Sequence, residues 1–263
     1  MKDYFDNIYK FSKDKLYENL KQSLINNKKE FIITANPEIF MTAKDNSLVS
    51  KMLLDSNNII VPDGISIVKS ARRFGINLEE RITGVDLSEY LLSLANKYKK
   101  SVYLFGGKKE VVNKLAEIIK DKYPHISNIY VKDGYVKNKG EVFNDIRKKK
   151  ADIVLVALGV PLQEEMIYSN INKLSKGIFV GVGGTFDVLS GTKKRAPKIF
   201  IKLNLEWLYR IIKEPRRLKR FFKYNIKFVC LVNKEKKRKS MERQTKPRSG
   251  FIRFDITKRS GVM

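Results

Sequence analysis

Side chains capable of acid–base chemistry stand at the ends of short apolar runs in this sequence. Thr34 closes one apolar run and Asn36 follows it, while Asp63 lies just beyond another run and directly before Gly64. A carboxylate in such a place can reach into a cleft and remove a proton from a substrate as a general base. Asp63 could instead cap a helix that begins at Gly64, and Asp187 is a competing carboxylate.

Three glycine-rich turns carry further polar residues. They include Gly106 and Gly107, the segment LGVPLQE at 158–164 with Gln163, and the segment GVGGTFD at 181–187 with Gly183 and Gly184. Glycine lets backbone N–H groups approach a phosphate at a helix N-terminus, so these are candidate ligand-binding residues. The spacing fits neither a P-loop nor a dinucleotide fingerprint, which disfavours a nicotinamide-dependent oxidoreductase and leaves the nucleotide unspecified.

Alternating strand and helix patterns position these residues. Strands are predicted at 31–34, 58–61, 101–105, 129–131, 153–157 and 177–180. Helices are predicted at 15–26, from Pro37 onward, and at 64–74, 86–99, 108–122, 141–149 and 163–174. This order predicts an α/β fold with a doubly wound, mostly parallel, Rossmann-like sheet. The carboxyl ends of parallel strands meet at one edge, so we expect the turns to converge there in a ligand site.

Positive charge is concentrated in the last part of the chain. The formal net charge is +26, and residues 193–263 hold 24 lysines and arginines against 5 acidic residues, whereas residues 1–192 hold 30 against 23. The contrast predicts an α/β catalytic domain at 1–197, a helical appendage at 198–233 with helices at 199–213 and 215–232, and a basic tail at 234–263 without regular structure. A nucleic-acid-binding protein is the main rival that this charge suggests.

Composition excludes several classes of site. With Cys230 as the only cysteine and His125 as the only histidine, we expect no disulfide framework, no cysteine metal cluster and no Ser-His-Asp triad. The N-terminus lacks the apolar segment of a signal peptide. The sequence also has no uninterrupted run of 18 apolar residues, which a bilayer-spanning helix would need. These features predict a cytoplasmic protein that is peripheral at the inner face of the membrane.

The helix predicted after Pro215 has two unlike faces at 100° per residue. One face is basic and comprises Arg216, Lys219, Arg220, Lys223 and Lys227. The other is apolar and comprises Leu218, Phe221, Phe222, Phe228, Val229 and Val232. We favour an interfacial helix that inserts the apolar face into a membrane. Packing against the protein's own body and a contact between subunits remain open.

Several motifs together resemble a known family. They are TANPE (34–38), PDG (62–64), RITGVD (81–86), LFGG (104–107), ALGVPLQE (157–164), GVGGTFD (181–187), KRAP (194–197), LEWLYR (205–210) and EPRR (214–217). In this order they resemble the WecG/TagA/CpsF glycosyltransferase family, glycosyltransferase family 26. The resemblance covers about residues 10–232.

The resemblance implies an inverting transfer of a sugar from a UDP-sugar donor to a polyprenyl-diphosphate-linked sugar acceptor at the membrane surface. For the members that the chain resembles most, the donor is UDP-N-acetylmannosamine. The acceptor is undecaprenyl-diphosphate-linked N-acetylglucosamine, and the product feeds wall teichoic acid linkage. UDP-glucose or UDP-N-acetylmannosaminuronic acid is the alternative donor. No metal and no cofactor are expected, the chain has no DxD motif, and we expect a homo-oligomer that binds no nucleic acid.

The resemblance also assigns roles to residues. Asp63 becomes the expected base, and Thr34 joins it in the catalytic set. Thr34 and Asn36 would position the sugar or the acceptor, and Gln163 would hydrogen-bond one substrate. Arginine binds phosphate oxygens bidentately, so the diphosphate should meet guanidinium groups of the appendage. The candidates are Arg210, Arg217 and Arg220, with the neighbouring Arg216 left open. Arg81 adds positive charge at the same edge, unless it only forms a surface ion pair with a nearby glutamate.

Overall fold

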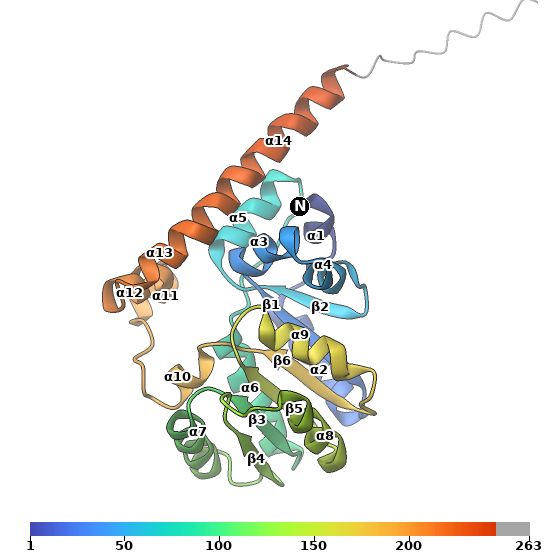
Figure 1. The fold of residues 1–263 in the computed structure, drawn as a ribbon, viewed down its shortest axis with the longest axis vertical. Coiled ribbons are helices and arrows are strands. Elements are labelled where there is room, and N and C mark those ends of the chain that lie inside the picture. Colours follow the sequence, from blue (N-terminus) through green and yellow to red (C-terminus); the bar gives the residue numbers. More distant parts are fainter. Residues whose placement is uncertain (246–263) are drawn as a thin grey trace, which may run out of the picture.

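The computed structural model describes residues 1–245, with side chains described at 1–238 and 241 (Figure 1). Its centre is a six-stranded, all-parallel sheet in the order β2-β1-β6-β5-β3-β4. The strands are β1 (Lys29–Ala35), β2 (Asn58–Pro62), β3 (Val102–Gly106), β4 (Ile129–Lys132), β5 (Ile153–Ala157) and β6 (Gly177–Gly181). All six predicted strands are present, and the α/β fold class with a parallel sheet is confirmed.

Helices cover both faces of the sheet, which explains why the inner strands are continuous apolar runs. One face packs against α1 (Lys2–Asp6), α3 (Pro37–Asp45), α4 (Ser47–Leu54), α5 (Ile65–Arg73), α8 (Lys139–Lys149) and α9 (Leu162–Ile171). The other face packs against α2 (Lys13–Ile25), α6 (Gly84–Lys97), α7 (Lys109–Lys122) and the short α10 (Thr185–Leu189). Every residue of β3, β5 and β6 is buried. Two cores, one on each face, therefore hold the strands in place.

The appendage contains more helices than predicted. Its elements are α11 (Lys198–Lys202), α12 (Glu206–Lys213), α13 (Arg217–Phe221), the π-turn η1 (Phe222–Ile226) and α14 (Lys227–Thr245). The helix predicted at 199–213 is interrupted because Asn204 takes a left-handed conformation with φ of 60°. None of the helices in the described part of the chain is both long and apolar enough to cross a membrane.

The expectation of an irregular tail from residue 234 is wrong for residues 234–245, which belong to α14. This stretch contains neither glycine nor proline and is rich in lysine, arginine and glutamate, which all favour helix. The docked first turns of α14 supply a nucleus from which the polar turns can continue. In Figure 1 the helix passes α5 and then extends away from the body. Residues 246–263 of the expected tail lie outside the described residues.

The beginning of α14 packs against the body. Phe228 and Val232 are fully buried and join the core formed with α1, α3 and α5. The Phe228 ring centroid lies 5.7 Å from that of Phe40 and 6.2 Å from that of Phe5. The Lys2 N–H donates to Glu235 at 3.2 Å, and the Arg73 guanidinium donates to Asn233. Packing on the body is therefore the role of this part of the apolar face.

The other residues of the predicted apolar face do not all point to solvent, as an interfacial helix would require. Val229 is partly buried against the same core, and Phe221 stacks on Trp207 with ring centroids 4.7 Å apart. Only Leu218 and Phe222 of the predicted apolar face are exposed, by 43% and 53%. The division at residue 197 into a catalytic domain and an appendage stays a prediction. Core residues nevertheless come from both sides of it.

We predict that Phe228→Ala lowers the free energy of unfolding by about 3–5 kcal/mol, because it removes a fully buried ring and leaves a cavity between α14 and the body. Phe222→Ala, six residues earlier on an exposed site, is the matched control and should change stability by less than about 0.5 kcal/mol. Urea unfolding of the two variants measures the difference. Equal effects would show that Phe228 does not contribute to the core.

Candidate functional site

A cleft of about 1450 Å³ opens at the carboxyl edge of the sheet, between the body and the appendage. Its body side comes from the loops after β1, β2, β5 and β6, with Gly107 after β3. Its other side comes from α12, α13, η1 and the start of α14. The structure therefore brings the predicted turns together, and the appendage faces them.

Asp63 lines the cleft directly after β2. Its backbone N–H donates to the Ala35 carbonyl at 2.8 Å, which holds the turn against β1. The alternative role as a helix cap is wrong, because α5 has Gly64, with φ of 120°, at its N-cap position. The Asp63 carboxyl accepts no hydrogen bond from the described residues, so it remains open toward the cleft.

Burial raises the pKa of Asp63 to about 6. Four charged neighbours modify this effect: Arg210 and Arg81 lower the pKa, whereas Glu206 and Asp86 raise it. A carboxyl group with this pKa is mostly ionised at pH 7 and yet is a stronger base than an ordinary aspartate. The electrostatics therefore suit proton abstraction near neutral pH.

Thr34 and Asn36 line the cleft beside Asp63 and also support the backbone. The buried Thr34 hydroxyl donates to the Gly181 carbonyl at 2.8 Å, which joins the ends of β1 and β6. The Asn36 side-chain oxygen accepts from the N–H groups of Glu38 and Ile39, at 2.9 and 3.2 Å, and caps α3. Substrate contacts by either residue stay predictions. The Asn36 amide nitrogen makes no hydrogen bond to the described residues and is available for them.

Gln163 ties two loops of the cleft together. Its side-chain oxygen accepts from the N–H of Gly159 at 3.1 Å and from the N–H of Gly183 at 3.0 Å. Its amide nitrogen donates to Glu164 at 2.7 Å. Glu164 is fully buried, and burial raises its pKa to about 8. The internal bonds of Gln163 shape the turn after β6, and its predicted contact with a substrate remains untested.

The candidate glycines fall into two groups. Gly107, Gly183 and Gly184 line the cleft, where their backbone is accessible to a ligand. Gly106 does not line it, and its expected place among the binding residues stays a prediction. A Cβ atom at Gly106 would lie 2.3 Å from the Ala157 carbonyl oxygen, and its φ of 124° belongs to glycine. Gly106 therefore permits the close approach of β3 and β5.

The three candidate arginines of the appendage all line the cleft, and each is paired with a carboxylate. Arg210 contacts Glu206 at 2.8 Å, Arg217 contacts Glu214 at 2.7 Å, and Arg220 contacts Glu38 at 2.5 Å. Arg216, which the sequence left open as a candidate, does not line the cleft, whereas its neighbour Arg217 does. Asp187 also lines the cleft and pairs with Lys193 at 3.2 Å. The structure thus places three guanidinium groups where an anion could replace carboxylate partners.

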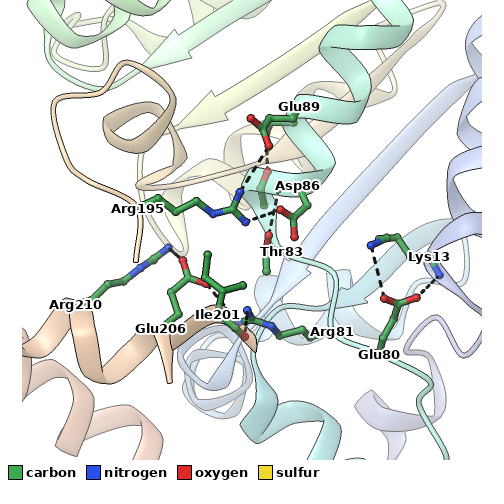
Figure 2. Close-up of polar contacts among 12 residues, drawn as sticks. Lys13, Glu80, Arg81, Thr83, Asp86, Glu89, Arg195, Ile201, Glu206 and Arg210 are labelled. Atoms are coloured by element: carbon green, nitrogen blue, oxygen red, sulfur yellow. Dashed lines mark hydrogen bonds and ion pairs between the residues drawn. The ribbon is translucent and has the colours of Figure 1, made fainter. Parts of the chain in front are cut away.

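Arg81 joins the body to the appendage, as Figure 2 shows. Its guanidinium lies 3.4 Å from the Glu206 carboxylate and donates to the Ile201 carbonyl at 3.4 Å. The sequence allowed a surface ion pair with a nearby glutamate. The partner is instead 125 residues away, and the nearby Glu80 pairs with Lys13. A second link runs from Arg195 to Asp86 at 2.5 Å and to Glu89 at 3.6 Å.

Sequence reasoning missed three acidic residues of this region: Glu38, Glu164 and Glu206. Each lies inside a motif that carried the family resemblance, namely TANPE, ALGVPLQE and LEWLYR. Membership in one of these motifs was therefore a usable signal. Among the described residues, no cluster of three or more histidine, cysteine, aspartate or glutamate side chains could hold a metal ion.

Comparisons with known proteins agree with the site. A model described as the glycosyl transferase WecG/TagA/CpsF family matches residues 6–242. The N-acetylglucosaminyldiphosphoundecaprenol N-acetyl-beta-D-mannosaminyltransferase of Bacillus subtilis (strain 168) is 42% identical over 187 residues, which are 71% of this chain and 73% of that protein. The protein of the same name from Staphylococcus aureus (strain MW2) is 35% identical over 187 residues, with the same coverage. The chain therefore belongs to the WecG/TagA/CpsF family of glycosyl transferases.

Proposed function

We propose that this protein is an inverting glycosyltransferase. It transfers N-acetylmannosamine from UDP-N-acetylmannosamine to undecaprenyl-diphosphate-linked N-acetylglucosamine, in the synthesis of the wall teichoic acid linkage unit. The observation that carries the proposal is Asp63, a carboxylate with a raised pKa in a cleft whose other wall bears three arginines. The names of the relatives supply the acceptor and the transferred sugar.

In this reaction Asp63 accepts the proton of the acceptor hydroxyl while that oxygen attacks the anomeric carbon of the donor. The bond between this carbon and the UDP oxygen breaks, and its electron pair passes to the diphosphate. Because the diphosphate gains negative charge, guanidinium groups at that place stabilise the transition state more than the ground state. Arg210, Arg217 and Arg220 take this role, and Asn36, Arg81, Gln163 and the glycine turns hold the substrates.

The carboxylates that pair with these arginines act as exchangeable partners. Arg210, Arg217 and Arg220 are 45%, 37% and 54% exposed at their side chains, so a diphosphate can reach them from the cleft. A diphosphate carries more charge than one carboxylate and accepts bidentate bonds, which favours the exchange. Donor binding therefore draws the appendage arginines from protein acids to phosphate oxygens.

A transfer assay with a short-chain lipid acceptor tests the function. We expect UDP-N-acetylmannosamine to be used in preference to UDP-glucose and UDP-N-acetylmannosaminuronic acid, with inversion at the anomeric carbon. Asp63→Asn should reduce turnover by roughly 10²–10⁴-fold, because the amide cannot accept the proton, while UDP still raises the melting temperature. More than about a tenth of wild-type turnover in this variant would exclude Asp63 as the essential base.

The raised pKa also predicts the pH dependence of the wild-type enzyme. Only the ionised carboxylate acts as a base. The turnover rate should therefore fall as the pH drops through about 6, and it should reach its maximum above that pH. The residual turnover of Asp63→Asn should lack this acid limb. A wild-type profile that stays flat down to pH 5 would contradict the assignment.

Arg217→Lys tests the contact to the diphosphate. Lysine keeps the charge but loses the bidentate fork, so kcat should fall by about one to two orders of magnitude. Arg216→Lys is a matched control one residue away that does not line the cleft, and its rate should stay within about twofold of wild type. Equal losses in the two variants would assign the effect to the charge of the appendage as a whole.

The surface of the appendage also supports the proposal that the protein binds at the membrane surface, where a polyprenyl acceptor lies. Its exposed apolar side chains stand among basic residues, a composition typical of interfacial helices. They are Ile199, Leu203, Ile212, Leu218, Phe222 and Ile226. We propose that this surface, rather than Phe228 and Val232, contacts lipid while the α/β body at 1–197 remains in the cytoplasm.

Replacing both Leu218 and Phe222 with Ser should weaken binding to phosphatidylglycerol vesicles by at least roughly tenfold, because apolar area is lost from the lipid contact. Phe11→Ser is the control, since Phe11 is as exposed as Phe222, at 53%, but lies on the body. Vesicle co-sedimentation measures both. Indifference to vesicles together with steep, salt-dependent binding to duplex DNA would favour a nucleic-acid-binding protein instead.

A further inference from the structure

Glu206 is a buried acid at the start of α12, where the appendage meets the body. Its side chain is 8% exposed, whereas that of the other acid of this helix region, Glu214, is 40% exposed. Its two carboxylate oxygens serve different partners: one lies 2.8 Å from Arg210 of the appendage, and the other lies 3.4 Å from Arg81 of the body (Figure 2). Because burying a charged group costs free energy, a buried acid that is paired with two arginines is not a mere surface charge, and its role needs an explanation.

The surroundings of Glu206 are also those of Asp63. Both residues line the cleft together with Arg81 and Arg210. The charged groups that act on Asp63 are Arg81 before α6, Asp86 on α6, and Glu206 and Arg210 on α12. Glu206 additionally acts on Arg195, which pairs with Asp86. The charge balance at Asp63 is therefore set by two arginines and two acids, and one member of each pair belongs to the appendage.

Without the Glu206 carboxylate, two guanidinium groups would act on Asp63 with only Asp86 to oppose them. Positive neighbours favour the ionised form of an acid and lower its pKa, which makes it a weaker base. Glu206 opposes this effect and at the same time holds both guanidinium groups in place. Arg81 keeps a second anchor in the Ile201 carbonyl, so its position does not depend on Glu206 alone.

We propose that Glu206 is a positioning residue that neutralises Arg81 and Arg210 beside Asp63 and thereby keeps Asp63 a strong base while the appendage is docked. The proposal rests on the proposed function, in which Asp63 is the base. Its consequence is that the closed enzyme is tuned by a residue of the appendage. If the appendage were displaced, Asp63 would lose the charges of Glu206 and Arg210, whereas Arg81 and Asp86 would remain on the body.

Three variants of the full chain test the proposal. Glu206→Gln keeps the shape and removes the charge, so the titration midpoint of Asp63 should fall by roughly one pH unit. Arg81→Gln removes an opposing charge, so the midpoint should rise. Glu214→Gln is the matched control: it also removes a carboxylate paired with an appendage arginine, but Glu214 is not among the groups that act on Asp63. Its midpoint should stay at the wild-type value.

Carboxyl carbon NMR, assigned by comparison with Asp63→Asn, measures the midpoint directly, and the acid limb of kcat should move with it. Docking of α12 is monitored independently by fluorescence, because the only tryptophan of the sequence, Trp207, stacks on Phe221 beside Glu206. An unchanged or raised midpoint in Glu206→Gln with unaltered Trp207 emission overturns the proposal. If Glu206→Gln instead releases α12 from the body, Arg81→Gln becomes the deciding variant. An unchanged or lowered titration midpoint of Asp63 in Arg81→Gln then overturns the proposal.

The two levels of inference fail in different ways. If the proposed base is wrong, Asp63→Asn keeps its turnover whatever the titration of Asp63 does in the other variants. If only the role of Glu206 is wrong, Asp63→Asn still loses most of its turnover, but the titration midpoint of Asp63 does not change when the charge at position 206 is removed. Opposite shifts in Glu206→Gln and Arg81→Gln, with none in Glu214→Gln, are the result that a purely structural role would not produce.

Discussion

The packing of Phe228 and Val232 against α1, α3 and α5 fixes the geometry on which the candidate site depends. A parallel sheet covered on both faces offers its functional groups only at the carboxyl ends of its strands, and that edge is open to water. Burying the start of α14 between α1, α3 and α5 fixes the appendage over this edge. The cleft then has two walls, and its carboxylate Asp63 and the three arginines of the appendage come from different parts of the chain.

Burial and charge act in opposite directions at Asp63. Removal from water alone raises its pKa, while Arg81 and Arg210 pull the pKa down again. The resulting value near 6 leaves the carboxylate ionised at neutral pH and still basic enough to accept a proton. The acids Glu206 and Asp86 belong to this balance as much as the arginines do. The pKa of the proposed base, Asp63, is therefore set by the charges of the protein itself.

The same alternation of charges suits the proposed binding of an anionic donor by the appendage. The three arginines that line the cleft are each paired with a carboxylate, namely Glu38, Glu206 or Glu214. Such pairs restrict the side chains and reduce the entropy lost when a diphosphate binds. They also join the appendage to α3, since the contact of Arg220 with Glu38 spans 182 residues of sequence.

Periodicity and turn chemistry determined the strands, most helices and the carboxyl-edge location of the polar turns, because these depend on local patterns that a linear sequence displays. The motifs around Asp63, Gln163 and Arg217 also indicated the family and its chemistry. Only the tertiary structure decided that Glu206 pairs with Arg81, that Gly106 serves strand packing, and that Phe228 faces the body instead of a membrane. An amphipathic helix presents the same pattern to a protein core and to a lipid surface. Its partner is chosen by the apolar area that the folded body leaves uncovered, which no local pattern records.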